Sequence, residues 1–166
     1  MSTVDNLRLA FTEEAKNSAL YLIFAEKADS EGKPHAARLF RALAESELIH
    51  GRAELQILDD YGSTVDNMQF AIATEEREFQ NMYARFLKDA RKEGNEEAAE
   101  LMSKIMKVER AHHDLLQEAM VKLLDAGDVT EGSVFVCRTC GNTVVGAQSE
   151  ACSICGSGPE MFYEIA

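Results

Sequence analysis

The 166-residue sequence has no tryptophan, only two prolines and no long apolar run. Scarce proline and abundant Ala, Leu, Glu, Lys and Met favour helices. A membrane-spanning helix needs roughly 20 consecutive, mainly apolar residues, which no stretch of this chain supplies. The N-terminus also lacks the basic segment and apolar run of a secretory signal. We therefore expect a cytoplasmic protein with no membrane partner.

Basic residues are scarce relative to acidic ones. The chain carries 17 Lys and Arg against 29 Asp and Glu, which gives a formal net charge of −12. Proteins that bind nucleic acid cluster Lys and Arg against phosphate, so this balance argues against a nucleic-acid partner. Most of the acidic residues are expected on the surface, and some of the others are candidate metal ligands.

Turn-forming and helix-capping residues divide residues 1–131 into four helical segments. The segments are expected to begin at about Val4, Pro34, Ser63 or Thr64, and Asn95, and to end near Glu31, Tyr61, Gly94 and Gly127. Proline suits the first turn of a helix, Ser and Asn cap its start, and glycine suits the position after its end. Long helices joined by short connections predict an all-α, antiparallel four-helix bundle.

An internal duplication relates the two halves of this helical region. With an offset of 62 residues, identical residue types coincide at Tyr21 and Tyr83, Phe24 and Phe86, Gly32 and Gly94, Leu39 and Leu101, Glu47 and Glu109, and His50 and His112. We interpret the region as two helical hairpins related by pseudo-twofold symmetry. Such symmetry places equivalent side chains around a common centre, which suits a site for two metal ions.

Two E-x-x-H motifs lie within the duplicated region. In the pairs Glu47/His50 and Glu109/His112, both side chains share one helical face, because residues three positions apart have Cβ atoms about 5–6 Å from each other. A single motif of this kind is usually a surface salt bridge. Two copies at equivalent positions of a duplicated bundle predict a carboxylate–histidine site for two metals.

Two further glutamate ligands are expected from the other two helices. The first segment offers Glu13 and Glu14, and the third offers Glu75, Glu76 and Glu78. A buried carboxylate is costly unless it is paired or bound to metal. An offset of 62 aligns Glu75 with Glu13, whereas an offset of 61 aligns it with Glu14. One inserted residue in the third helix would explain this discrepancy, so we predict a π-bulge there.

Two tyrosines and two histidines are weaker candidates for the metal site. Tyr21 and Tyr83 occur within apolar faces, and two roles suit them: packing in the core, or a hydrogen bond from the hydroxyl to a metal-ligating carboxylate. The second role is more attractive for Tyr21, which lies two turns after Glu14. His35 follows a proline at a helix start, and His113 lies on a different helical face from the adjacent motif. We expect both of these histidines to be solvent-exposed.

The C-terminal segment, residues 132–166, changes character and is predicted to be a small β-rich domain. Its two C-x-x-C motifs, each followed by glycine, comprise Cys137, Cys140, Cys152 and Cys155. Short strands are expected at residues 134–136 and 161–163. Four thiolates form a tetrahedral site that suits zinc or iron, and the motifs alone favour a zinc ribbon. So short a segment needs a bound metal to supply the stability that its small core cannot.

Taken together, these motifs resemble the rubrerythrin family, a ferritin-like di-iron bundle joined to a rubredoxin-like domain. The resemblance covers nearly the whole chain. The sequence Ala10-Phe11-x-x-Glu14 resembles the family's A-F-x-x-E and favours Glu14 over Glu13. The family's other motifs correspond to Glu47-x-x-His50, Glu75-x-x-Glu78, Met82-Tyr83 and Glu109-x-x-His112. One departure is Ser153, where rubredoxin-like sites often have proline.

The resemblance implies a set of metal ligands. For two irons in the bundle they are Glu14, Glu47, His50, Glu75, Glu78, Glu109 and His112, and for a third iron they are Cys137, Cys140, Cys152 and Cys155. Zinc suits the same four thiolates. Glu78 is additional to the general ferritin-like set, and in the family an iron moves between this carboxylate and the histidine equivalent to His50. Glu78, His50 and Tyr21 are therefore the candidate catalytic residues.

For function, the resemblance implies a non-haem peroxidase that reduces hydrogen peroxide to water in oxidative-stress defence. A reduced rubredoxin or an NAD(P)H-dependent reductase would deliver electrons through the four-cysteine site, and a homodimer is expected. Two alternatives stay open at this point. One is a ferritin-like ferroxidase or iron-storage protein, and the other is an adaptor whose zinc ribbon binds another protein.

Overall fold

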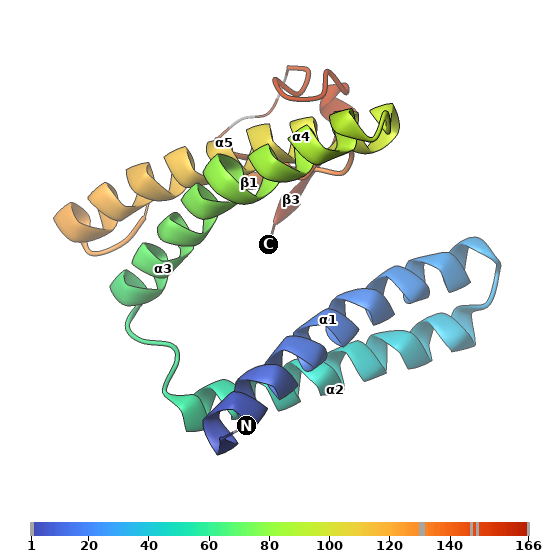
Figure 1. Cartoon of the computed structure of the whole chain (residues 1–166), viewed down its shortest axis with the longest axis vertical. Helices are drawn as coiled ribbons and strands as arrows, with labels where there is room; N and C mark the ends of the chain where they lie inside the picture. Colours follow the sequence, from blue (N-terminus) through green and yellow to red (C-terminus); the bar gives the residue numbers. More distant parts are fainter. Residues whose placement is uncertain (1, 130–131, 147, 149, 166) are drawn as a thin grey trace. The chain divides into compact units, whose positions relative to one another are not determined.

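The structure, a computed structural model, describes residues 2–129, 132–146, 148 and 150–165. It consists of long helices followed by a small C-terminal antiparallel sheet, as Figure 1 shows. The chain divides into two compact units, Met1–Gly62 and Ser63–Ala166. None of the helices in the described ranges combines the length and apolar character that crossing a membrane requires.

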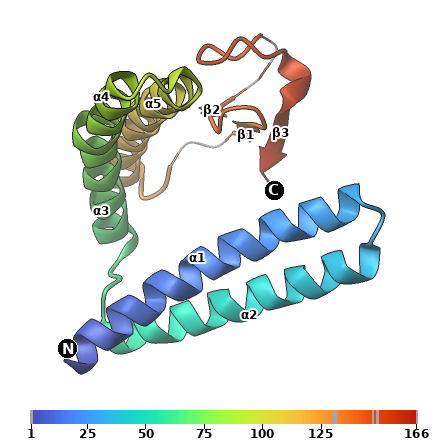
Figure 2. The same cartoon turned by 45° about the vertical axis from the view of Figure 1, so that its right-hand side comes forward.

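The first unit is a hairpin of two helices, α1 (Thr3–Ser30) and α2 (Pro34–Leu58), which run side by side in Figures 1 and 2. Ser2 and Asp5 form a reciprocal capping box at the start of α1, which satisfies backbone N–H groups that the helix leaves without partners. Pro34 occupies the first turn of α2, as predicted from the sequence.

Small residues bring the two helices of this hairpin close together. Ala25, Ala28 and Ala37 are buried near the turn, and Phe40 packs against them. Farther along, Gly51 is buried, and a Cβ atom at that position would lie 3.3 Å from the ring of Phe11. A larger residue in place of Gly51 would therefore push α1 away from α2.

Helix α2 ends earlier than the sequence predicts. The expected end was near Tyr61, but the helix stops at Leu58 and Asp59 adopts a left-handed conformation with φ of 52°. Aspartate tolerates this conformation better than most residues. The next residue, Asp60, accepts a hydrogen bond from Arg8 at 3.2 Å, which ties the end of α2 to α1.

The second unit contains another helical pair. Its first partner is α3 (Thr64–Arg77), which continues through a π-helical segment, η1 (Glu78–Met82), into α4 (Tyr83–Lys92). Its second partner is α5 (Glu96–Ala126), which contacts all three. The caps predicted at Ser63 and Asn95 are both present, because each side chain accepts a hydrogen bond from a backbone N–H in the first turn.

The π-helical segment confirms the predicted one-residue insertion. The duplication offset is 61 from Glu14 to Glu75 but 62 from Tyr21 to Tyr83, so the extra residue must enter between Glu75 and Tyr83. Segment η1 occupies that interval. A π-turn accommodates one more residue than an α-turn and rotates the side chains that follow it.

The C-terminal part of the second unit is a three-stranded antiparallel sheet of order β2-β1-β3 (Figure 2). Its strands are β1 (Val134–Cys137), β2 (Thr143–Val145) and β3 (Phe162–Ile165). Strand β2 was not predicted because only three residues separate its flanking turns. The closing strand begins one residue later than expected, because Met161 ends a short 3₁₀ helix, η2 (Pro159–Met161).

Helical hairpins followed by a small sheet confirm the predicted fold class. The predicted boundary between residues 131 and 132 falls partly outside the described residues, since the structure describes residue 132 but not residue 131.

Candidate metal centres

One group of candidate ligands lies in the first unit. It consists of Glu14 on α1 with Glu47 and His50 on α2, whose ligand atoms all lie within 4.8 Å of one another. The His50 Nδ1 atom is 3.4 Å from a Glu47 carboxylate oxygen and 3.5 Å from one of Glu14. Helices α1 and α2 approach closely here, because a Cβ atom added at Gly51 would lie only 3.8 Å from the Cβ atom of Glu14. This close approach allows the two carboxylates to meet.

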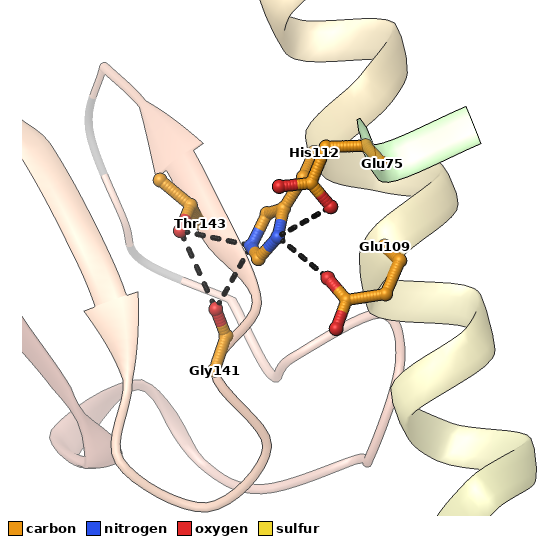
Figure 3. Close-up of polar contacts among 5 residues, drawn as sticks. All are labelled: Glu75, Glu109, His112, Gly141 and Thr143. Carbon is orange, nitrogen blue, oxygen red and sulfur yellow. Dashed lines mark hydrogen bonds and ion pairs between the residues drawn. The ribbon is translucent and has the colours of Figure 1, made fainter. Parts of the chain in front are cut away.

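The second unit holds an equivalent group, which Figure 3 shows. Glu75 extends from α3, and Glu109 and His112 extend from α5, again with ligand atoms within 4.8 Å of one another. The His112 Nδ1 atom lies 3.0 Å from a Glu109 oxygen and 3.8 Å from a Glu75 oxygen. Each unit therefore presents two carboxylates and one imidazole from a helical pair.

The two carboxylates in each group repel one another when both are charged. A hydrogen bond shared with Glu14, followed by burial, raises the pKa of Glu47. Burial, followed by a hydrogen bond with Glu109, raises the pKa of Glu75. A bound cation would replace the shared proton and remove the repulsion between the carboxylates.

Unpartnered carboxylate oxygens also fit a metal. The Oε2 atoms of Glu14 and Glu75 are buried and, apart from their longer contacts with His50 and His112, have no hydrogen-bond partner among the described residues. Buried polar atoms normally have hydrogen-bond partners, so oxygens without one at two duplicated positions fit the role of metal ligands. Two carboxylates and an imidazole form a donor set that suits iron.

A third oxygen of this kind was missed in the sequence analysis. Glu54 Oε2 is buried and likewise has no hydrogen-bond partner among the residues described. Glu54 follows Glu47 by seven residues, nearly two helical turns, which places both on one side of α2. That spacing was the available signal, but Glu54 has no counterpart in the duplication, where position 116 is leucine.

The far side of the His112 ring faces a cysteine turn rather than a carboxylate. Its Nε2 atom lies 3.2 Å from the Gly141 carbonyl oxygen and 3.2 Å from the Thr143 hydroxyl (Figure 3). The Thr143 hydroxyl donates to the same carbonyl oxygen, at 3.3 Å. A carbonyl oxygen only accepts, so the contact places the ring proton on Nε2 and leaves the Nδ1 lone pair for a metal.

The neighbouring histidine corrects one expectation. The side chain of His113 is only 12% exposed, and its ring packs against Phe79 of η1 at a centroid distance of 5.5 Å. The inserted π-turn brings a phenylalanine to this side of α5, which sequence spacing alone did not indicate. His35 is exposed, as expected.

Glu78 and Tyr21, two of the candidate catalytic residues, lie outside both ligand groups. Glu78 opens η1 and is partly buried. Burial raises the pKa of the Tyr83 hydroxyl, and the charges of Glu109 and then Glu78 raise it further. Tyr21 packs against Phe24 and Phe40 with ring centroids 6.3 Å from each.

The four cysteines come together on two turns with the same backbone pattern. Cys137 N–H donates to the Asn142 carbonyl and Cys152 N–H to the Ser157 carbonyl, at 2.9 and 2.8 Å. In both turns the glycine after the second cysteine has a positive φ, 82° and 76°, and donates back to the first cysteine. The two turns therefore aim two sulfurs each at a common point.

The sulfur positions fit a tetrahedral metal site. The Sγ atoms of Cys137 and Cys155 are 3.8 Å apart, and those of Cys140 and Cys152 are 3.6 Å apart. Metal–sulfur bonds of about 2.3 Å in a tetrahedron place sulfurs about 3.8 Å apart. Hydrogen bonds with the Ser157 hydroxyl and backbone lower the pKa of Cys155 to about 6, whereas burial raises that of Cys140.

Comparisons with known proteins agree with this arrangement. A family model described as Rubrerythrin matches residues 5–120. Rubrerythrin-2 of Clostridium acetobutylicum is 33% identical, over 96% of this chain and 95% of its own length. Nigerythrin of Nitratidesulfovibrio vulgaris is 29% identical, over 97% of this chain and 85% of its own. A solved structure titled as the fully reduced, all-ferrous state of nigerythrin has a TM-score of 0.59 and 28% identity, and the match covers 99% of this chain and 87% of that one.

Proposed function

Because this chain belongs to the rubrerythrin family, whose members are generally oxidoreductases, we propose that it is a non-haem iron peroxidase. The reaction takes up two electrons and two protons, cleaves the O–O bond of hydrogen peroxide and releases two waters. The observation that carries the proposal is the occurrence in one chain of duplicated carboxylate–histidine groups and a four-thiolate group. The former suit a two-electron metal centre, and the latter suits a one-electron carrier.

Two proposed domains divide this work. Residues 1–131 would supply the di-iron ligands, namely Glu14, Glu47, His50, Glu75, Glu78, Glu109 and His112. Residues 132–166 would hold one iron through Cys137, Cys140, Cys152 and Cys155. When bound, two ferrous ions supply both electrons for O–O cleavage and act as Lewis acids toward peroxide.

The protein's own residues would hold and orient these ions. The paired carboxylates, which share a proton when no metal is bound, would become charge-balancing ligands, and this ties metal binding to the stability of each helical pair. Glu78 lies one helical turn after Glu75 and opens the π-turn at η1. We propose that Glu78 and His50 are the two ligands that exchange one iron, and that Tyr21 donates a hydrogen bond to a ligating carboxylate.

The contact between His112 and Gly141 supports electron entry through the cysteine site. Gly141 directly follows the ligand Cys140, and its carbonyl oxygen lies 3.2 Å from His112 Nε2. One hydrogen bond therefore joins the backbone of a cysteine turn to the imidazole of a carboxylate–histidine group. The proposed donor is a reduced rubredoxin or an NAD(P)H-dependent reductase, and the proposed assembly is a homodimer without nucleic acid.

A steady-state assay tests the proposal against iron storage. Protein loaded anaerobically with ferrous iron is supplied with NADH through a rubredoxin reductase and a rubredoxin, and peroxide and NADH are followed together. The peroxidase predicts one NADH per peroxide and no further iron uptake. Slow peroxide turnover together with progressive uptake of added ferrous iron would favour the ferritin-like alternative.

A further inference from the structure

One polar side chain in the described part of the cysteine domain is almost completely buried. Asn142 is 3% exposed and lies two residues after Cys140. Its amide nitrogen Nδ2 donates a hydrogen bond of 3.8 Å to the sulfur of Cys152. The side chain therefore extends from the first cysteine turn to a ligand of the second turn.

The backbone fixes Asn142 in this position. Its carbonyl oxygen accepts from Cys137 N–H at 2.9 Å, and its backbone N–H donates to the sulfur of Cys140. A side-chain replacement leaves both of these bonds available. The hydrogen bond from the Asn142 side chain to Cys152 can therefore be removed while the turn is retained.

The equivalent residue of the second turn behaves differently. Ser157 has the same backbone role, but its hydroxyl contacts a sulfur of its own turn, that of Cys155 at 3.3 Å, and donates to the Thr139 hydroxyl at 3.0 Å. Among the described residues, Asn142 alone donates a side-chain N–H to a cysteine sulfur. The pseudo-symmetric site is thus asymmetric in its hydrogen bonding.

A donor at this sulfur acts on the redox equilibrium of a bound iron. Reduction of ferric iron held by four thiolates adds one negative charge, which spreads onto the sulfurs. An N–H group directed at a sulfur stabilises the more negative, reduced form, and burial strengthens the effect because water does not screen it. Leaving a buried amide without a hydrogen-bond partner is energetically costly, so the bond is retained in both redox states.

We propose that Asn142 is a positioning residue that raises the reduction potential of the four-cysteine iron site through its bond to Cys152. This rests on the proposed function only in taking iron as the metal and the site as the electron inlet. The consequence is a site that accepts an electron from a donor more readily than the same four thiolates without the amide.

The test is the midpoint potential of the purified, iron-loaded, full-length protein, followed through the visible absorption of the ferric thiolate site. Asn142→Leu keeps the approximate size and removes the donor. This variant should lower the equilibrium constant for reduction of the iron threefold to tenfold. For one electron, that is a negative shift of the midpoint potential of about 30–60 mV. Asn142→Asp should shift the potential further in the same direction, because it adds a negative charge beside the sulfurs.

A matched control is Gln148→Leu. It removes another amide of the same domain, one that donates to the Glu150 carbonyl oxygen at 2.6 Å rather than to sulfur. Its potential should equal that of the parent protein. An unchanged or more positive potential in a folded Asn142→Leu protein would overturn the proposal.

A second measurement does not depend on a variant. In ¹⁵N-labelled parent protein with ¹¹³Cd in the cysteine site, scalar coupling between cadmium and an Asn142 side-chain amide proton is expected across the N–H···S bond. Absence of that coupling would also overturn the proposal. Neither measurement involves peroxide turnover, so both outcomes are independent of whether the peroxidase function holds.

Discussion

His112 Nε2 lies 3.2 Å from the carbonyl oxygen of Gly141, so a metal-binding candidate of helix α5 directly contacts a cysteine turn. The opposite ring nitrogen, Nδ1, faces Glu109 at 3.0 Å. The imidazole thus has one nitrogen oriented by the cysteine domain and the other directed at the carboxylates. The same contact sets the histidine tautomer and supplies the proposed path for electrons.

The Thr143 hydroxyl completes this contact, and Thr143→Val should weaken it. Valine has a similar shape but cannot bond to His112 Nε2 or to the Gly141 carbonyl. The hydrogen bond between His112 and the Gly141 carbonyl is retained in this variant. We therefore expect about a tenfold loss in affinity for the metal bound through His112, which is the lower end of the range for residues that support a metal ligand. Competition with a chelator measures this. Thr139→Val is the control, since its hydroxyl contacts Ser157 instead, and equal affinities in both variants would contradict the prediction.

Glu78→Ala should separate metal binding from peroxide chemistry. Glu78 opens the π-helical segment but lies outside both carboxylate–histidine groups of the described structure. We expect the fold and iron content to be retained while the rate of peroxide reduction falls about 100-fold, as for a misplaced reacting centre. Glu76→Ala is the matched control, because Glu76 is exposed on the same helix and bonds to Gln80. Turnover equal to the control would remove Glu78 from the catalytic set.

Cys152→Ala should uncouple the two proposed iron sites. Cys152 is 3% exposed, and its loss leaves three thiolates for the C-terminal metal. The proposed di-iron site should still be oxidised normally in a single turnover with peroxide, but repeated turnover with an electron donor should stop. The exposed neighbour Ser153, changed to alanine, should behave as the parent does. Parent-like steady-state activity in Cys152→Ala would show that electrons do not need this site.

The metal-free protein should respond to pH through Glu75. Because its folded-state pKa is raised above the ordinary value of 4.5, the folded state retains a proton that the unfolded chain releases. The Glu75 contribution to stability therefore becomes less favourable as pH rises from about 4.5 through the raised pKa, and then levels off.

Glu75→Gln removes this titration. The midpoint temperature of unfolding of the metal-free variant, taken relative to that of the metal-free parent, should therefore increase as the pH rises through that window. Comparing the two proteins cancels the opposite trend from Asp5 and Asp66, whose pKa values are lowered by their caps. With iron bound, the order should reverse because the variant has lost a ligand. A difference between the two metal-free proteins that stays constant with pH would refute the assignment.

The sequence predicted those features that depend on local spacing or on the duplication. The two E-x-x-H pairs follow from helical geometry, and the disagreement between offsets of 61 and 62 was enough to predict a π-bulge in the third helix, which the structure places at Glu78–Met82. Capping residues at Ser63 and Asn95 could likewise be read directly, since a cap involves only the next few residues.

Features that depend on pairing between distant segments could not be predicted. The approach of Gly141 to His112 requires strand β2 to lie against α5, and no local pattern encodes that contact. His113 was wrongly expected to be exposed because its partner, Phe79, is placed by the π-turn. Asn142 looks like an ordinary turn residue until the second cysteine turn supplies a sulfur beside its amide.

The most direct test of the proposed peroxidase is stopped-flow mixing of the fully reduced, iron-loaded protein with hydrogen peroxide and, separately, with dioxygen at equal concentration. The proposed function predicts oxidation by peroxide that is much faster than oxidation by dioxygen, with two electrons withdrawn for each peroxide consumed. Faster oxidation by dioxygen, with peroxide accumulating or left unused, would contradict it.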